Sequence, residues 1–154
     1  MNLKGRKSKT KSRTLKNPAK AESTGQEINY EITMKLVFTA VSKRLFYFRM
    51  HISKFVLEKD CIPLNPYMLW EYFMLDTIER DKIREANNTL VEKADELWVF
   101  GEVSDGVLAE IKLAKERQKP IKYFAVIDSK EIKEIPKEKV KFEEGLEDMP
   151  KAEL

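Results

Sequence analysis

Along the chain, short apolar runs alternate with longer stretches whose apolar residues have helical spacing. The run Met34 to Val41 (MKLVFTAV) is nearly continuous, which is typical of a strand covered on both faces. Between Lys43 and Lys59 the apolar residues recur on one helical face. Cys61 to Pro66 (CIPLNP) is a second short apolar run, and it ends at an Asn-Pro break. The order strand, helix, strand is therefore predicted for this half.

The second half continues the alternation. The predicted elements are a helix to about residue 94 that opens with a capping box at Asp76 and Glu79, a strand over 97–100, a helix over 104–117, a strand over 121–127, and a weak final strand or hairpin around Ile135, Val140 and Phe142. Parallel neighbouring strands need crossover helices. The pattern predicts an α/β fold with a three-layer, open, mostly parallel sheet of the flavodoxin-like or Rossmann-like kind. Its ligand site should lie at the carboxyl ends of the strands.

The N-terminal residues lack this pattern. Residues 1–24 contain eight Lys and Arg and one acid, Glu22, with no aromatic residue. Such a segment buries too little to offset the entropy cost of ordering. We expect a basic disordered tail over 1–28, the α/β domain over 29–145 and an acidic flexible C-terminus over 146–154. The tail is either simply solvated or makes a weak contact with nucleic acid.

Composition narrows the functional classes. Without residues 1–24 the chain has 21 Lys and Arg against 25 Asp and Glu, a net charge of −4, which favours a small-molecule domain over a polyanion-binding one. The sequence shows neither a membrane-spanning run nor a signal peptide, so we expect a cytoplasmic protein. The single Cys61 and single His51 are too few for an internal disulfide or a zinc site, and we expect no metal and no cofactor.

Candidate chemistry follows the third predicted strand. Gly101, Ser104, Asp105 and Gly106 stand at its carboxyl end, where the next helix begins. Free N–H groups and the helix dipole can hold a phosphate or a sugar hydroxyl there, and Gly106 would let a ligand approach the backbone. Ser104 and Asp105 have a second explanation as helix N-caps. Both interpretations stay open.

Glu110 lies four residues after Gly106, on the same helical side and near the same edge of the sheet. A solvated glutamate is one interpretation. The other is a carboxylate held in a fixed geometry, where it could attack an electrophilic sugar carbon.

The stretch ADELWVFGEVSDGVLAEIKLAKERQKPI, residues 94–121, resembles the segment that nucleoside 2-deoxyribosyltransferases and related nucleotide N-hydrolases build around their catalytic glutamate. The resemblance implies that Glu110 attacks the anomeric carbon, releases the base and passes the deoxyribosyl group to another base or to water. It also implies a nucleoside or nucleotide as ligand and a homo-oligomer that completes its sites across subunits.

The chain departs from this family in two places. The position of the second acid, eight residues before Asp95, is Asn87, and an amide cannot exchange protons as a carboxylic acid does. Asp105 is the candidate to replace it. In the loop after the first strand, Ser42, Lys43 and Arg44 either contact a phosphate or face solvent. The predicted catalytic residues are Glu110, Asp105 and Asn87, and the predicted substrate-binding residues are Thr39, Ser42, Asn65, Gly101, Ser104 and Gly106.

The aromatic stretch over 67–75 (YMLWEYFML) also has two explanations. It is ordinary core, or it offers Tyr67, Trp70, Tyr72 or Phe73 for stacking on a nucleobase. The sequence thus leads first to an enzyme that cleaves or transfers at an N-glycosidic bond. The alternatives are a non-catalytic nucleotide-binding module and an accessory protein that reaches nucleic acid through its basic tail.

Overall fold

The computed structural model describes residues 34–71 and 76–154, so the predicted basic tail and the side chains of Tyr72 and Phe73 lie outside the described residues. In chain order its elements are β1 (Lys35–Val41), the 3-10 helix η1 (Lys43–Phe48), α1 (Arg49–Leu57), β2 (Cys61–Leu64), α2 (Pro66–Leu69), α4 (Arg80–Lys93), β3 (Glu96–Phe100), α5 (Asp105–Glu116), β4 (Ile121–Ile127), β5 (Glu131–Ile135) and the 3-10 helices η2 (Lys137–Lys139) and η3 (Lys151–Glu153).

The five strands form one sheet in the order β2-β1-β3-β4-β5. The first four are parallel, and β5 runs antiparallel to β4. This confirms the predicted α/β fold with a mostly parallel sheet. The last strand contains Ile135, but Val140 and Phe142 lie beyond it. Asp128 and Ser129 have φ values of 48° and 53°, which suit a tight hairpin turn that brings the chain back beside β4 at once.

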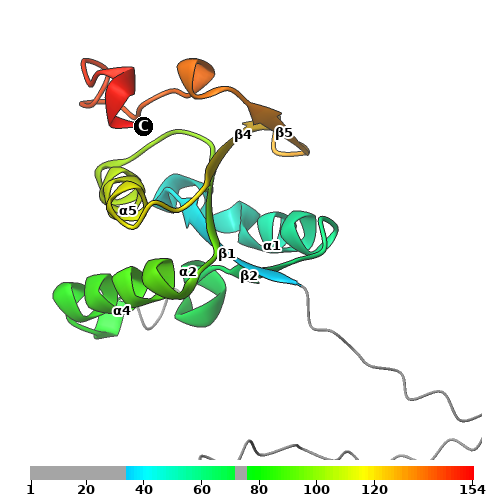
Figure 1. The fold of residues 1–154 in the computed structure, drawn as a ribbon, viewed down its shortest axis with the longest axis vertical. Coiled ribbons are helices and arrows are strands. Elements are labelled where there is room, and N and C mark those ends of the chain that lie inside the picture. The colour runs from blue at the N-terminus through cyan, green and yellow to red at the C-terminus, as the bar shows by residue number, and fades with distance from the viewer. Residues whose placement is uncertain (1–33, 72–75) are drawn as a thin grey trace, which may run out of the picture. The chain divides into compact units, whose positions relative to one another are not determined.

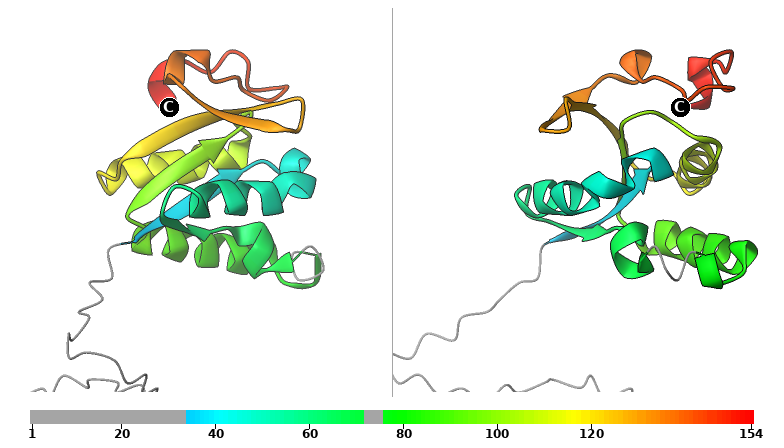
Figure 2. Two further views of the ribbon diagram at one scale, coloured as in Figure 1. Left: turned by 90° about the vertical axis from the view of Figure 1, so that its right-hand side faces the viewer. Right: turned by 180° about the vertical axis from the view of Figure 1, so that it is seen from behind.

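Helices cover both faces of the sheet (Figures 1 and 2). Successive strand residues point to opposite faces, so each apolar run contributes to two clusters. On the α1 side the buried cluster includes Val37, Val41, Trp98, Phe100, Ile52 and Val56. On the side of α4 and α5 it includes Phe38, Ala40, Leu97, Val99, Ile111 and Ala114. Burial on both faces is the physical reason why the strand sequences are nearly continuous in apolar residues.

The topology directs attention to the carboxyl ends of β1 and β3. The connection from β1 to β2 passes through α1 on one face, and the connection from β3 to β4 passes through α5 on the other (Figure 1). The chain therefore leaves the two neighbouring strands β1 and β3 in opposite directions. Open α/β sheets bind their ligands at such a switch point.

The observed helix starts agree with the sequence prediction at α5 but not at α4. Ser104 caps α5, because its hydroxyl accepts a hydrogen bond from the N–H of Val107 at 3.3 Å. The prediction of a capping box at Asp76 and Glu79 is wrong, because Glu79 is itself the N-cap of α4 and its side chain makes no cap hydrogen bond. In the described ranges no helix combines the length and the apolar character that crossing a membrane requires.

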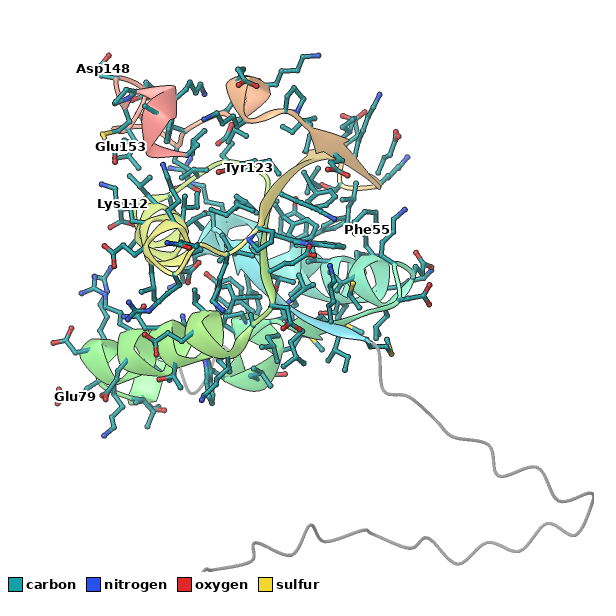
Figure 3. The ribbon with its side chains drawn as sticks, viewed as in Figure 1. Phe55, Glu79, Lys112, Tyr123, Asp148 and Glu153 are labelled. Carbon is teal, nitrogen blue, oxygen red and sulfur yellow. The ribbon has the colours of Figure 1, made fainter. Side chains whose placement is uncertain are left out.

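The C-terminal segment, residues 140–154, packs on the side of α5 (Figure 1). Leu154 is buried with the α5-side cluster, and Lys115 donates hydrogen bonds to the carbonyl oxygens of Ala152 and Leu154. Figure 3 shows Lys112 and Glu153 on this same side, where they form an ion pair of 2.9 Å. In this structure the residues predicted to be a flexible terminus thus have defined contacts.

Candidate active site

A cavity of about 930 Å³ opens at the carboxyl ends of β1 and β3. Its walls come from the loops after β1, β2 and β3, from α4 and α5, and from the C-terminal segment. Among the predicted site residues, Thr39, Ser42, Asn87, Ser104, Asp105, Gly106 and Glu110 all line it. Asn65 and Gly101 are not among the lining residues.

Glu110 contributes a carboxyl group to the wall of this cavity from the second turn of α5. The residue keeps part of its surface accessible, yet the protein surrounding its carboxyl removes enough solvent to raise the pKa to about 8. No hydrogen bond or ion pair from the described residues reaches this carboxyl. A desolvated, unpartnered carboxyl in a cavity wall is available to a ligand, and such groups are typical of functional sites.

Tyr67 lines the same cavity as Glu110. Burial, followed by the negative charges of Glu110 and Glu143, raises the pKa of its phenol to about 12. The phenol therefore stays protonated at neutral pH and can only donate to a carboxylate. Its ring packs edge-on against Phe46, with ring centroids 5.3 Å apart. The nucleobase-stacking role suggested for Tyr67 stays a prediction.

Asn65 holds the backbone of Tyr67 in place. This fully buried amide accepts from the N–H of Tyr67 at 3.1 Å and donates to the Arg49 carbonyl and the Ser53 hydroxyl, both at 3.1 Å. Its oxygen and both hydrogens thus have protein partners. The structure therefore gives Asn65 the role of fixing the turn from β2 into α2.

Glu143 is a lining residue that the sequence analysis missed. Its side chain is 14% exposed, and its carboxylate accepts a hydrogen bond from the hydroxyl of Ser42 and lies 3.7 Å from Arg44 Nε. Its N–H donates to the carbonyl of Val103 at 3.0 Å, just after β3. The sequence signal was weak, because Glu143 stands among other acids in a segment without helix or strand periodicity.

Asn87 is held by an aromatic partner. The indole Nε1 of Trp70 donates to Asn87 Oδ1 at 2.9 Å, and an indole N–H can act only as a donor. The amide oxygen is therefore occupied, and the amide NH₂ is the part left to meet a ligand. Asn87 can donate a hydrogen bond into the cavity, but it cannot move a proton. Trp70 is consequently engaged in fixing α4.

The backbone N–H groups at the start of α5 mostly have hydrogen-bond partners within the same turn. Besides the Ser104 cap, Asp105 Oδ1 accepts from the N–H of Gly106 at 2.8 Å, and the Ser104 carbonyl accepts from Leu108. These bonds support the N-cap interpretation. They leave few backbone donors for a phosphate, and the negative Asp105 would repel one. A Cβ added at Gly106 would have Ser104 Oγ as its nearest neighbour, at 4.0 Å, so the backbone here is open to close approach by a ligand.

Gly101 has a structural explanation. Its φ is 77°, and a Cβ at this position would come within 2.4 Å of Leu45 Cδ1. Its N–H donates to the carbonyl of Phe124 at 2.9 Å. Only glycine fits the turn that leads the chain from β3 toward the cavity.

Thr39 is fully buried, and its hydroxyl makes one long contact of 3.4 Å to the carbonyl of Leu64. Charged groups of both signs surround the cavity above it. The cations are Lys43, Arg44, Arg80 and Arg84, and the acids are Asp76, Asp105, Glu110 and Glu143. A ligand here would meet donors on the α4 side and carboxylates on the α5 side.

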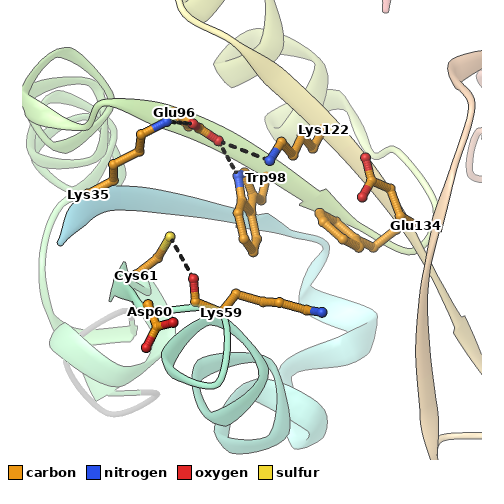
Figure 4. Close-up of a pocket in the computed structure, with 9 residues that line it drawn as sticks. Lys35, Lys59, Asp60, Cys61, Glu96, Trp98, Lys122 and Glu134 are labelled. Atoms are coloured by element: carbon orange, nitrogen blue, oxygen red, sulfur yellow. Dashed lines mark hydrogen bonds and ion pairs between the residues drawn. The ribbon is translucent and has the colours of Figure 1, made fainter. Parts of the chain in front are cut away.

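A cavity of about 410 Å³ lies at the opposite, amino-terminal edge of the sheet (Figure 4). Its buried acid, Glu96, accepts from Lys35 Nζ at 2.6 Å and from Trp98 Nε1 at 2.9 Å, and Lys122 Nζ lies 3.6 Å away. Burial alone would raise the pKa of Glu96, but these donors and charges outweigh it and lower the pKa. Both carboxylate oxygens of Glu96 have a donor or a positive charge beside them. We therefore interpret this cluster as a structural ion-pair network.

No three His, Cys, Asp or Glu side chains in residues 34–71 and 76–154 come together in a way that could hold a metal ion. The larger cavity presents carboxyl, phenol, hydroxyl and amide groups.

The sequence profile of a family described as "Domain of unknown function (DUF7768)" matches residues 38–124, more than half of the chain. No curated protein matches. Among solved structures, a 2-desoxiribosyltransferase from Leishmania mexicana is similar at 16% identity with a TM-score of 0.47, over 60% of this chain and 65% of that one. The chain thus spans about two thirds of that protein, and at this identity the likeness concerns the fold alone.

Proposed function

The chain belongs to the family described as Domain of unknown function (DUF7768), and we propose that it is an enzyme acting at the N-glycosidic bond of a nucleoside or nucleotide. The observation that carries the proposal is the carboxyl of Glu110, unpartnered by any described residue in the wall of the cavity. The resemblance of residues 94–121 to the segment around the catalytic glutamate of deoxyribosyltransferases supports the same role.

In the proposed reaction, ionised Glu110 attacks the anomeric carbon of the sugar. A bond forms between its carboxylate oxygen and this carbon, while the bond from the carbon to the base nitrogen breaks. The base leaves with the electron pair and takes a proton from water. The glycosyl ester on Glu110 is then passed to another base or to water, as in other retaining glycosyl transfers.

The surroundings of Glu110 suit this role in one respect and constrain it in another. Tyr67 stays protonated in the same cavity, and it could donate a hydrogen bond to a sugar oxygen. However, a pKa of about 8 leaves only about a tenth of the carboxyl ionised at pH 7. Ligand hydroxyls or cations must therefore favour the charged form when substrate binds.

A non-catalytic nucleotide-binding module is the second candidate function, and one observation favours it. The Asn87 amide, fixed by Trp70, can donate a hydrogen bond to a ligand but offers no proton for chemistry. Such a site would hold a nucleotide between the α4 arginines and the start of α5 without cleaving it.

The test is incubation of the purified protein with a panel of deoxynucleosides and deoxynucleotides, with free base measured by chromatography. We expect base release by wild type and none by Glu110→Gln. Glu116→Gln is the matched control, because Glu116 is an exposed glutamate on the same helix. Saturable nucleotide binding without base release from any substrate would instead establish the binding module.

A further inference from the structure

The proposed reaction needs a group that can accept a proton, and the expected position does not provide one. At Asn87 an amide stands in place of the acid, and its oxygen is occupied by Trp70. Asp105 is exposed and its Oδ1 accepts from the N–H of Gly106, within its own turn. The acid that the geometry brings into the cavity in a fixed position is Glu143.

The backbone of Glu143 is held at the end of β3. The N–H of Val103 donates to the carbonyl of Lys141 at 2.9 Å, and the N–H of Glu143 donates back to Val103 at 3.0 Å. Phe142 between them is buried in the α5-side cluster. These contacts place an acid from the C-terminal segment beside the loop that leads into α5.

The side chain is held as firmly. Ser42 donates to one carboxylate oxygen of Glu143, and Arg44 Nε lies 3.7 Å from the other. Ser42 is itself 3% exposed and follows β1 directly. A carboxylate that is mostly buried, hydrogen-bonded and still part of a cavity wall has the fixed geometry that proton transfer requires.

Tyr67, Glu110 and Glu143 all line the same cavity, so the two acids face one shared space. The negative charges of both acids also add to burial in raising the pKa of the Tyr67 phenol, which agrees with this shared placement. Two carboxyl groups on either side of a sugar are the arrangement that glycosidic-bond chemistry uses.

We propose that Glu143 is the general base of the second half-reaction. It orients a water molecule over the glycosyl ester on Glu110 and accepts a proton from it. The water oxygen bonds to the anomeric carbon, the bond from that carbon to Glu110 breaks, and Glu110 leaves as a carboxylate. This inference rests on the proposed function, and it assigns the missing proton acceptor to a residue 33 positions beyond Glu110 in the chain.

The experiment is pre-steady-state measurement of free base after mixing with excess deoxynucleoside or deoxynucleotide. Glu143→Gln keeps an oxygen that can accept from Ser42, so the variant should retain the fold. We expect it to release about one equivalent of base in a rapid burst and then to turn over about 10²-fold to 10³-fold more slowly. Added azide, which needs no general base to attack, should restore turnover in this variant and not in Glu110→Gln.

The controls separate the possible results. Glu144→Gln removes the adjacent, exposed acid and should behave as wild type. Turnover by Glu143→Gln within about threefold of wild type, or loss of the burst together with turnover, would overturn the role of Glu143 while leaving that of Glu110 intact. Absence of base release by wild type would overturn the proposed function, and the role of Glu143 with it.

Discussion

The hydroxyl of Ser42 donates a hydrogen bond to the carboxylate of Glu143, which lies 101 residues later in the chain. Ser42 also caps η1, because its oxygen accepts from the N–H of Arg44 at 3.2 Å. One buried side chain therefore joins the loop after β1 to the C-terminal segment. This link closes one side of the candidate site.

Removal of this link should be measurable as a loss of stability. We expect Ser42→Ala to lower the free energy of unfolding by about 2 kcal/mol, since it removes a cap and a hydrogen bond to a charged group. Ser104→Ala is the control, because it removes only the cap of α5 and should cost about 1 kcal/mol. Urea denaturation measures both. Equal losses in the two variants would show that the Glu143 contact adds nothing.

This link also marks the limit of what the sequence could predict. The strands were predictable because burial on both faces leaves near-continuous apolar runs such as 97–100. The cluster from Ser104 to Glu110 was predictable because it directly follows a strand and opens a helix. Glu143 was not, since its place depends on a bridge to Val103 and on packing of Phe142, neither of which has a local sequence signature.

Local roles within the site were also hidden from the sequence. Asn65 and Gly101 stand after strands, as ligand-binding residues do. In the structure, however, the Asn65 amide is hydrogen-bonded to protein groups, and Leu45 fills the space beside Gly101. The sequence could place these residues after strands because the strand pattern determines that position. The use of each side chain depends on distant partners such as Arg49 and Leu45, and these can be identified only in three dimensions.

The two glycines near the site should respond oppositely to alanine. Gly101→Ala should destabilise the protein by about 1 to 3 kcal/mol, because φ is 77° and the Cβ would collide with Leu45. Gly106→Ala should be neutral or stabilising by up to about 1 kcal/mol, since the space is open and the residue is helical. Thermal unfolding of both variants is the measurement. If Gly106→Ala keeps stability but loses ligand binding, close ligand approach at Gly106 is supported.

Tyr123 on β4 carries a buried hydroxyl that has no hydrogen-bond partner in the structure. Burial also raises the pKa of this phenol to about 12, so the group remains neutral. We expect Tyr123→Phe to be neutral or to stabilise the protein by about 1 kcal/mol, because it removes an unsatisfied polar group. Tyr47→Phe, which loses a surface contact to Ser129, is the control. A clear loss of stability in Tyr123→Phe would mean that its hydroxyl has a partner outside the protein groups described.

The raised pKa of Glu110 predicts a pH dependence of stability. Between its ordinary value of 4.5 and about 8, the folded protein retains a proton that the unfolded chain has lost. Stability must then fall as pH rises through this window, by at most about 1.4 kcal/mol per pH unit from this group. Denaturation of wild type and Glu110→Gln at pH 5, 6, 7 and 8 isolates the effect. The difference between the two should favour Glu110→Gln increasingly toward pH 8, whereas Glu116→Gln should follow wild type.

The same protonation decides how Glu110 can act on a substrate. A nucleophile must be ionised, so kcat/KM for base release should rise about tenfold per pH unit up to about pH 8 and then level off. If Glu110 instead protonated the leaving base, the reactive form would be the neutral acid and kcat/KM would fall above pH 8. Rates for wild type between pH 5.5 and 9.5 distinguish these roles, because the nucleophile profile rises below the pKa and is level above it, whereas the acid profile is level below the pKa and falls above it. A falling profile would transfer the attack on the sugar from Glu110 to a water molecule, and Glu143 would then be the carboxylate that activates it.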